Sequence, residues 1–456
     1  MSLQKNQVFT LRVERLSSDG SGVAHSPDGE TVFIPGAAPG DEARVRIVKD
    51  CKRYAFGILD EVLTPSPDRI PVDCAVAGPC GGCSLRHLDY AAELRAKQEN
   101  VADAFARIGG LDVPVLPIVG SPEVNRYRNK VQFPVGVDKS GKPCIGFYAG
   151  RTHRIVPCPD CRLQPGVLNE IGNALCAFFA EKGIQPYSEE TGRGLVRHIF
   201  LRRGAHSGQI MVCLVCTRSK LPSAEELCTR LKAQFAEITT ILLNVNAKNT
   251  NVILGTETHT LYGPGYIEDT LCGVPVQLGP LSFYQVNTLA AEQLYGIAAQ
   301  YAQLTPDDLL LDLYCGMGTI GLSMAAHCRE LIGVEIVPEA IESAKANAAR
   351  MGADVAAKSR FFCADAGQAA TRLAAEGLHP DIVMLDPPRK GCDEATLSAV
   401  VRMSPRRVVY VSCNPATAAR DAAWLEQNGY HAEKVQPVDL FPRTRHCECV
   451  LSLSKV

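Results

Sequence analysis

Residues 309–318 read Leu-Leu-Leu-Asp-Leu-Tyr-Cys-Gly-Met-Gly, and this stretch decides the fold that we expect for the chain. The apolar run predicts a buried strand, and the glycines predict a tight turn that leads into a helical pattern, as in the first unit of a nucleotide-binding sheet. Glycine is needed where the backbone approaches a ligand closely, so Gly316 is a candidate cofactor contact. Strand-like and helical stretches alternate from about residue 286 onward, which predicts a parallel α/β sheet.

Acidic residues end the next two predicted strands. Glu335 ends the first, 19 positions after Gly316, which is near the spacing of about 20 at which a carboxylate holds ribose hydroxyls. Asp365 ends the second and could hold an adenine amino group. Gly321 also completes the spacing of a nicotinamide fingerprint, and a lone Gly-x-Gly can be a structural turn, so these residues alone leave the cofactor open.

Two further motifs follow the fourth and fifth predicted strands, at the sheet edge where ligands bind. They are Asp-Pro-Pro-Arg-Lys-Gly at 386–391 and Ser-Cys-Asn-Pro-Ala-Thr at 412–417. An enzyme that methylates an exocyclic amine would carry a tyrosine where this chain has Arg389, and a cytosine enzyme would carry a proline where it has Ser412. A thiolate at Cys413 suits a different reaction, in which addition to carbon 6 of uracil makes carbon 5 nucleophilic.

That reaction also needs a base, because the proton on carbon 5 must be removed before the thiolate can leave. In the predicted strand at 446–450, period-2 alternation places His446 and Glu448 on one face and two cysteines on the other. Glu448 is an acid in an otherwise apolar strand, where an unpaired charge is costly, and this favours a functional role over a solvated edge.

The glycine turn together with Asp386-Pro387-Pro388 resembles the class I S-adenosylmethionine-dependent methyltransferases. Adding Phe283, the Gln-Val-Asn at 285–287 and the His-Cys-Glu-Cys-Val at 446–450 extends the match, and the ordered set resembles the RNA uracil-C5 (5-methyluridine) methyltransferase family. The resemblance implies S-adenosylmethionine as cofactor, Cys413 as nucleophile and Glu448 as base. The residues that it implies for the cofactor and target-base site are Gln285, Tyr314, Gly316, Glu335, Asp365 and Asp386.

The 19 cysteines are too dispersed, in too long a chain, for a secreted disulfide scaffold. Cys74, Cys80 and Cys83 are close together, and this suggests zinc or an iron–sulfur cluster, although the spacing is neither that of a zinc ribbon nor the Cys-x3-Cys-x2-Cys of radical enzymes. Ribosomal-RNA members of the resembled family carry a [4Fe–4S] cluster on the same Cys-x5-Cys-Gly-Gly-Cys form. The resemblance places the fourth ligand at Cys161, with Cys158 an extra cysteine nearby.

The net charge of −2 provides no global positive field for nucleic acid. Residues 126–203 nevertheless hold 13 Lys and Arg against six Asp and Glu, and we expect RNA to bind there through phosphate contacts and base stacking. The expected RNA contacts are Arg126, Tyr127, Arg128, Lys130, Phe283 and Arg389. The short strands before residue 63 suggest a small barrel, and their Gly-Val-Ala-His and Val-Phe-Ile-Pro-Gly-Ala stretches resemble the TRAM domain, an OB-like RNA-binding module.

We therefore expect a TRAM-like β-barrel at 1–63, a mixed α+β domain with the cluster and an RNA surface at 64–285, and a class I methyltransferase sheet at 286–456. Barrel and cysteines together favour 23S ribosomal RNA as the substrate. A transfer-RNA uracil methyltransferase and a non-catalytic RNA-binding iron–sulfur assembly factor are the alternatives. The chain does not start with the apolar core of a signal peptide, and no apolar run approaches 18 residues, so we expect a cytoplasmic protein without a membrane span. We also expect a monomer.

Overall fold

The computed structural model describes residues 3–150, 152–248 and 250–456. The chain forms two compact units, each built from separate stretches of sequence. The first unit comprises Met1–Val124, Pro387–Asp393 and Arg407–Val456, and the second comprises Asn125–Asp386 and Glu394–Arg406. The three consecutive domains expected from the sequence stay a prediction.

The first unit begins with a six-stranded sheet in the order β1-β5-β6-β4-β3-β2. Its strands are β1 (Val8–Arg12), β2 (Arg15–Leu16), β3 (Ser21–His25), β4 (Thr31–Pro35), β5 (Glu42–Asp50) and β6 (Tyr54–Thr64). Alternate residues of β5 are buried, because one face packs inward and the other is wet. A Cβ on Gly57 would lie 2.4 Å from Val45, so only glycine allows the strands to close at that point.

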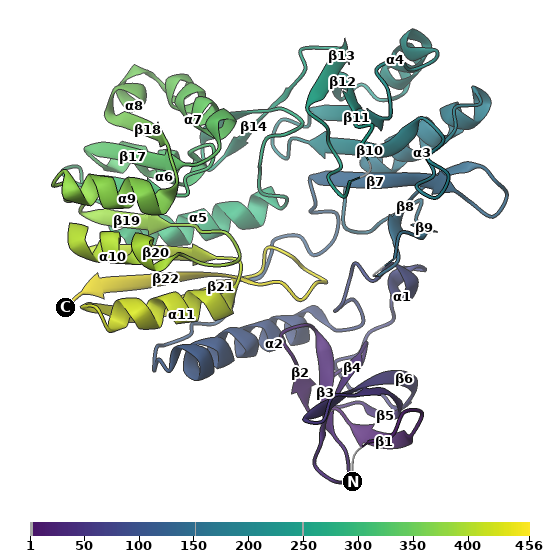
Figure 1. Ribbon diagram of the computed structural model, residues 1–456, viewed down its shortest axis with the longest axis horizontal. Coiled ribbons are helices and arrows are strands. Elements are labelled where there is room, and N and C mark those ends of the chain that lie inside the picture. The colour runs from purple at the N-terminus through teal and green to yellow at the C-terminus, as the bar shows by residue number, and fades with distance from the viewer. Residues whose placement is uncertain (1–2, 151, 249) are drawn as a thin grey trace. The chain divides into compact units, whose positions relative to one another are not determined.

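One long helix packs against this sheet within the first unit. The six-stranded sheet of β1 to β6 is the barrel of the first unit. The helical segments that follow it are α1 (Ala77–Cys80), α2 (Tyr90–Asp103) and η1 (Ala104–Gly109). Segment η1 continues α2 with π-helical bonding. The Asp89 carboxylate caps α2 by accepting from the backbone N–H of Ala91. Leu16 and Ala38 of the barrel share a buried apolar cluster with Leu85, Leu88 and Ala96. Helix α2 thus lies beside the barrel (Figure 1), and this cluster holds it there.

The first unit also contains a three-stranded antiparallel segment with β22 at its centre. Its elements are β20 (Arg407–Ser412), α11 (Pro415–Glu426), β21 (Tyr430–Val438) and β22 (Glu448–Lys455). Pro415 occupies the first turn of α11, and the Asn414 side chain caps the helix by accepting from the backbone N–H of Ala416. The strand expected at 446–450 begins only at Glu448, so His446 lies in the preceding loop and its expected place on a strand face is wrong.

The second unit contains a seven-stranded sheet in the order β13-β12-β11-β10-β7-β8-β9, covered by two helices, and a separate hairpin. Its elements are β7 (Lys130–Val137), β8 (Pro143–Tyr148), β9 (Ile155–Pro157), α3 (Gly166–Glu181), β10 (Val196–Arg203), β11 (Ile210–Cys216), α4 (Ala224–Gln234), β12 (Ile238–Val245), β13 (Glu257–Tyr262), β14 (Ile267–Leu271) and β15 (Val274–Leu278). All seven residues of β11 are buried, because this central strand is covered on both faces.

The second unit also holds four parallel strands in the order β18-β17-β16-β19, alternating with helices along the chain (Figure 1). The elements are α5 (Thr288–Ala302), β16 (Leu309–Leu313), α6 (Thr319–Met324), η2 (Ala325–His327), β17 (Glu330–Glu335), α7 (Pro338–Met351), α8 (Ala353–Lys358), β18 (Ser359–Cys363), α9 (Ala366–Ala375), β19 (Ile382–Leu385) and α10 (Glu394–Met403). The expected parallel α/β arrangement is therefore present, and every residue of β16 is buried.

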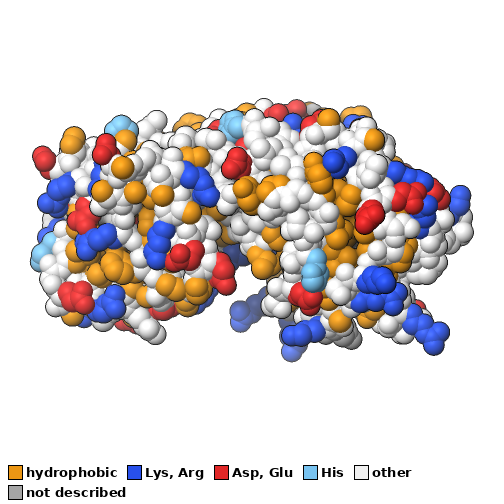
Figure 2. All heavy atoms as spheres, turned by 90° about the horizontal axis from the view of Figure 1, so that it is seen from above, with side chains coloured by type: hydrophobic (Ala, Val, Ile, Leu, Met, Phe, Trp, Pro, Cys, Tyr) orange, Lys and Arg blue, Asp and Glu red, His pale blue; other side chains and the backbone are white. Residues whose placement is uncertain are grey.

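The surface agrees with the near-zero net charge. Cationic and anionic side chains are intermingled on the face drawn in Figure 2, and hydrophobic side chains lie between them. Over the described part of the chain, every helix is too short or too polar to traverse a bilayer.

Candidate active site

The turn between β16 and α6 is shaped to bring backbone close to a ligand. Tyr314, Gly316 and Gly318 all have positive φ, at 66°, 55° and 80°. A Cβ on Gly316 would meet nothing within 4 Å, so this position faces open space. Tyr314 adopts a conformation that side-chain-bearing residues rarely occupy, and such positions concentrate at ligand sites.

Glu335 lies directly beside this turn, as the sequence spacing predicts. Its carboxylate accepts hydrogen bonds from the backbone N–H of Gly316 at 3.2 Å, of Ile336 at 2.8 Å and of Val337 at 3.0 Å. Ile336 and Val337 are 61% and 46% exposed, so the acid is followed by an open apolar surface of the kind that contacts an aromatic base. The sequence analysis missed these two residues, although two apolar residues after a strand-ending acid were a usable signal.

Asp365 belongs to the same edge of the sheet. It follows β18, in which Cys363 pairs with Glu335 of β17, and parallel strands bring such ends together. The Asp365 side chain caps α9 by accepting from the backbone N–H of Gln368. The structure thus brings together Tyr314, Gly316, Glu335 and Asp365, four of the residues expected at the cofactor.

The carboxyl groups of the buried Asp312 and the half-buried Asp386 lie behind the glycine turn. Burial raises the pKa of Asp312 to about 8 and that of Asp386 to about 7. One oxygen of Asp312 accepts from the backbone N–H of Gly321 at 3.0 Å, whereas its buried Oδ1 has no hydrogen-bond partner among the described residues. An orphaned carboxylate oxygen beside an open glycine turn fits a cationic ligand such as S-adenosylmethionine, which carries an ammonium and a sulfonium. The sequence alone predicts no role for Asp312, which lies inside the apolar run of β16.

Gln285 is held in place from two directions. The Asn129 side chain donates to the backbone carbonyl of Gln285 at 2.8 Å and to the Thr288 hydroxyl at 2.9 Å. The Gln285 side chain hydrogen-bonds to Tyr295, a buried residue that lies close to Asp386 and that the sequence analysis also missed. These contacts connect Gln285 to the carboxyl groups behind the glycine turn.

Phe283 is presented on a fixed loop. The buried Arg202 guanidinium donates to the backbone carbonyls of Gly279 and Ser282 at 2.8 Å and 2.7 Å, and so anchors the loop before Gln285. Phe283 and Leu281 are nevertheless 71% and 65% exposed. An exposed aromatic ring on an anchored backbone is suited to stacking on a base.

Arg126 and Tyr127, two of the expected RNA contacts, both make contacts within the fold. The Arg126 guanidinium pairs with Asp160 at 2.7 Å and donates to the carbonyl of Cys161 at 2.8 Å, so it holds the loop that carries Cys161. Tyr127 is 5% exposed, and its ring is not available as a stacking surface. Arg126 therefore has partners within the fold and Tyr127 is buried, and the RNA contacts expected at both residues stay predictions. Arg128 and Lys130 are half-buried, and burial together with Arg202 and Arg128 lowers the pKa of Lys130 to about 8.

In the first unit, Cys413 follows β20 and is half-buried. β20 and β22 pair with Ser412 opposite Cys449, so the next antiparallel position sets Cys413 beside Glu448. Burial raises the pKa of the Cys449 thiol well above its usual value, and the neighbouring Cys447, Glu448 and Cys413 add to the shift. Strand pairing therefore brings together the expected nucleophile and the expected base, which lie 35 positions apart in the sequence.

The loop that carries Arg389 is tied to the start of α11. The Asn414 side chain donates to the carbonyl of Arg389 at 2.9 Å, and the Arg420 guanidinium donates to that of Lys390 at 3.0 Å. The buried Asp421 accepts from the backbone N–H of Cys392 and from the Tyr410 hydroxyl. Arg389 is thereby kept exposed next to the Cys413 loop.

A cavity of about 860 Å³ opens onto Cys413 within the first unit. Its walls come from the barrel, from α2 and η1, and from the loops around Cys413 and His446. The Arg, Lys and His side chains that line it are Arg15, His25, Lys97, Arg107, Arg389, Arg445 and His446. Two acids, Asp19 and Asp103, also line it, and Phe33 provides an aromatic wall. Cations and an aromatic ring around a partly exposed thiol suit a polyanion that presents a planar base.

The expected metal ligands are distributed over both units. Cys74, Cys80 and Cys83 surround α1 in the first unit, are partly exposed and form no disulfide. The Arg86 guanidinium hydrogen-bonds to the Cys83 sulfur, which suits a thiolate. Cys161 belongs to the second unit, and within the described ranges no three ligating side chains stand in metal-binding geometry. The thiol donors match iron–sulfur chemistry, and the ligand set stays a prediction.

Comparisons with known proteins give the family. The family model of the tRNA (uracil-5-)-methyltransferases matches residues 205–456, and that of the TRAM domain matches residues 3–59. An uncharacterized RNA methyltransferase of Oceanobacillus iheyensis is 41% identical over 99% of this chain and 97% of its own length. One of Halalkalibacterium halodurans is 43% identical over 99% and 98%.

A solved structure extends this likeness to the whole fold. The tRNA (uracil-54, C5)-methyltransferase of Pyrococcus abyssi, in complex with S-adenosyl-L-homocysteine, matches with a TM-score of 0.78 and 26% identity. The match covers 98% of this chain and 100% of that one. The expected fold class, an α/β methyltransferase with an N-terminal TRAM barrel, is confirmed. The chain belongs to the tRNA (uracil-5-)-methyltransferase family and is an S-adenosylmethionine-dependent RNA methyltransferase.

Proposed function

We propose that this protein methylates carbon 5 of a uridine in 23S ribosomal RNA, in the cytoplasm, with Cys413 as nucleophile and Glu448 as base. The observation that carries the chemistry is the pairing of β20 with β22, in which Ser412 lies opposite Cys449, so that the next antiparallel position sets Cys413 next to Glu448. Cys413 also lines the cavity to which the barrel contributes. Arg128, Lys130, Phe283 and Arg389 are the proposed RNA contacts. Gln285, Tyr314, Gly316, Glu335, Asp365 and Asp386 are the proposed cofactor and target-base contacts.

S-adenosylmethionine supplies the electrophilic methyl group when it is bound. The Cys413 thiolate adds to carbon 6 of the uracil, and the ring electrons move to make carbon 5 nucleophilic. After carbon 5 has gained the methyl group, Glu448 takes the proton from the same carbon. The electrons of that C–H bond re-form the C5–C6 double bond and expel the Cys413 thiolate. Because the base must leave its stack to be attacked, an unpaired loop uridine suits the site.

The choice of ribosomal RNA rests on the combination of the TRAM barrel with the cysteine set. A transfer-RNA uracil methyltransferase is the second candidate, since the structural relative from Pyrococcus abyssi is named as one. The non-catalytic alternative, an RNA-binding assembly factor, is disfavoured by the retention of Cys413 and Glu448 side by side.

Deletion of the gene should remove 5-methyluridine from 23S ribosomal RNA and leave it in transfer RNA. Mass spectrometry of nuclease fragments from both RNA classes locates the loss, and re-expression of the wild-type chain should restore it. Purified protein should then methylate 23S RNA from the deletion strain but not its transfer RNA. Loss confined to transfer RNA would replace our substrate with the second candidate.

We also propose that Cys74, Cys80, Cys83 and Cys161 bind a [4Fe–4S] cluster. Protein purified without oxygen should contain about four iron atoms and four sulfides per chain. Cys80→Ser should lose most of this iron, whereas Cys51→Ser, at a half-exposed cysteine of the barrel, should retain it. Comparing Cys158→Ser with Cys161→Ser identifies the fourth ligand. Zinc in place of iron in the wild-type protein would refute the cluster.

A further inference from the structure

We propose that Lys97 and its partners on α2 are positioning residues for the base, because they hold the loop that leads into Glu448. This inference rests on the proposed roles of Cys413 and Glu448. The loop runs over residues 439–447, between β21 and β22. Val438 pairs with Glu448 across the two strands, so Asp439 is one residue beyond the partner of the base.

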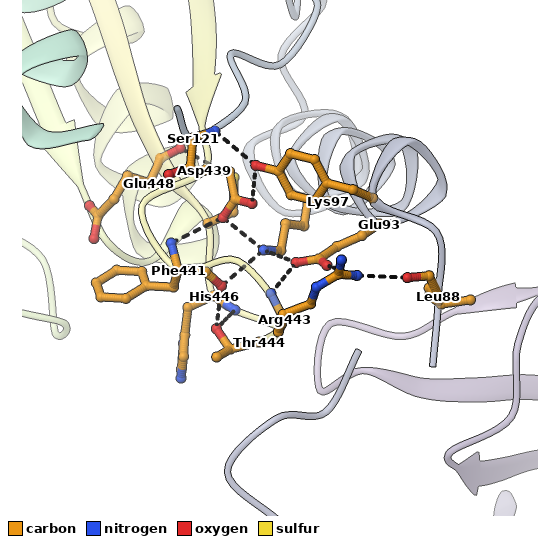
Figure 3. Close-up of polar contacts among 12 residues, drawn as sticks. Leu88, Glu93, Lys97, Ser121, Asp439, Phe441, Arg443, Thr444, His446 and Glu448 are labelled. Atoms are coloured by element: carbon orange, nitrogen blue, oxygen red, sulfur yellow. Dashed lines mark hydrogen bonds and ion pairs between the residues drawn. The ribbon is translucent and has the colours of Figure 1, made fainter. Parts of the chain in front are cut away.

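Lys97 binds both the start of this loop and its own helix. Its ammonium donates to Asp439 Oδ1 at 2.8 Å, to Glu93 Oε1 at 2.7 Å and to the backbone carbonyl of Phe441 at 3.2 Å. These three bonds use all the protons of the ammonium. Figure 3 shows these bonds between α2 and the loop. Glu93, Lys97 and Asp439 are at most 1% exposed, so the bonds are shielded from bulk water.

Further bonds fix the rest of the loop to the same helix. The Tyr90 hydroxyl donates to Asp439 Oδ2 at 3.0 Å and accepts from the backbone N–H of Ser121 at 2.8 Å. The backbone N–H of Arg443 donates to Glu93 at 2.7 Å, and its guanidinium donates to the carbonyl of Leu88 at 2.7 Å. The loop is therefore held at both Asp439 and Arg443 (Figure 3).

The loop that this network holds leads to the cavity that contains Cys413. Within the loop, the rings of Phe441 and His446 meet edge to face with their centres 6.0 Å apart, and His446 lines the cavity with Cys413. The Glu448 carboxylate points away from Lys97 and Glu93 (Figure 3). Lys97 and Tyr90 thus act through the loop backbone and are not themselves catalytic residues.

Stability alone does not account for such a network. Well-packed apolar side chains often stabilise a protein as much as a buried ion pair does, whereas directional bonds fix one geometry. Misplacement of a reacting group by about 1 Å can cost on the order of 100-fold in rate. A disturbed loop should therefore slow proton removal, the step assigned to Glu448, more than the attack by Cys413.

The test compares Tyr90→Phe and Asp439→Asn with Glu433→Gln. Glu433 forms an ion pair with Arg407 at 2.6 Å on the same hairpin, toward the end remote from Glu448, and this makes it a matched control. Single-turnover methyl transfer, steady-state turnover and the amount of covalent RNA–protein complex on denaturing gels are measured for each protein. We expect the two loop variants to retain the first methyl transfer within about twofold, to lose about 10- to 100-fold in turnover and to accumulate the complex. The control should do none of these.

A purely structural role predicts a different pattern. It would lower the melting temperature and the active fraction but leave the ratio of first turnover to steady state at the wild-type value, and this result overturns the inference. Tyr90→Phe keeps its ring and removes one hydroxyl, so it reports even where Asp439→Asn fails to fold. Adding Tyr90→Phe to Glu448→Gln should cause no further loss of turnover, because both act on one step. Wild-type protein that forms no covalent complex with RNA containing 5-fluorouridine would instead refute the proposed function.

Discussion

Replacing Cys413 with alanine is expected to reduce methylation by on the order of 10⁴-fold or more, because carbon 5 of uracil is not nucleophilic until a thiolate has added to carbon 6. The variant should also form no covalent complex with RNA that contains 5-fluorouridine, which traps the wild-type enzyme because the fluorine cannot be removed as a proton is. Transfer of radiolabelled methyl groups measures the first effect, and denaturing gels measure the second.

Cys51→Ala is the matched control, since Cys51 is a half-exposed cysteine on a barrel turn outside the site. It should retain both activities. Binding of S-adenosylmethionine to Cys413→Ala, measured by calorimetry, should match the wild-type value, because the proposed cofactor contacts lie on other residues. Methylation that persists in Cys413→Ala would exclude the thiolate mechanism.

Replacing Glu448 with glutamine is expected to stop the reaction after one methyl transfer. The amide cannot accept the proton, so turnover should fall by about 10²- to 10⁴-fold while the first methyl group is still transferred. The Cys413–RNA complex should then accumulate on ordinary uridine RNA. Rapid-quench measurements separate the burst of methyl transfer from the slow steady state.

Glu433→Gln introduces the same chemical change on the neighbouring strand and should leave burst and turnover intact. A Glu448→Gln protein without a burst would show that Glu448 acts before or during methyl transfer. An unchanged turnover would show that another group takes the proton.

The cofactor site could be predicted from sequence because its spacing is local. Gly316 and Glu335 end neighbouring parallel strands, and the fold sets the distance between them. The placement of Cys413 next to Glu448 depends instead on the pairing of β20 with β22, which the sequence does not reveal. These two residues could be identified only because their motifs resemble those of a known family. A role for Asp312 could not be predicted, because a single acid inside an apolar run does not show whether its oxygens have hydrogen-bond partners.

The partners of Arg126 within the fold could not be predicted for a different reason. Local charge shows how many cations a segment contains but not which of them already have partners inside the fold. The Arg126 guanidinium is used by Asp160 and by backbone carbonyls, and the ring of Tyr127 is buried. The ring of Phe283 is exposed, so it is available for the stacking that stays a prediction.

Helix α2 limits how freely the barrel could be exchanged during evolution. One side of it contributes Ala96 to the cluster shared with the barrel, and another contributes Glu93 and Lys97 to the loop before Glu448. Deleting the barrel would expose that cluster to water and disturb the anchor of the base. The barrel and the loop before Glu448 both pack against α2. We therefore expect the barrel and the catalytic segment to be inherited and lost together.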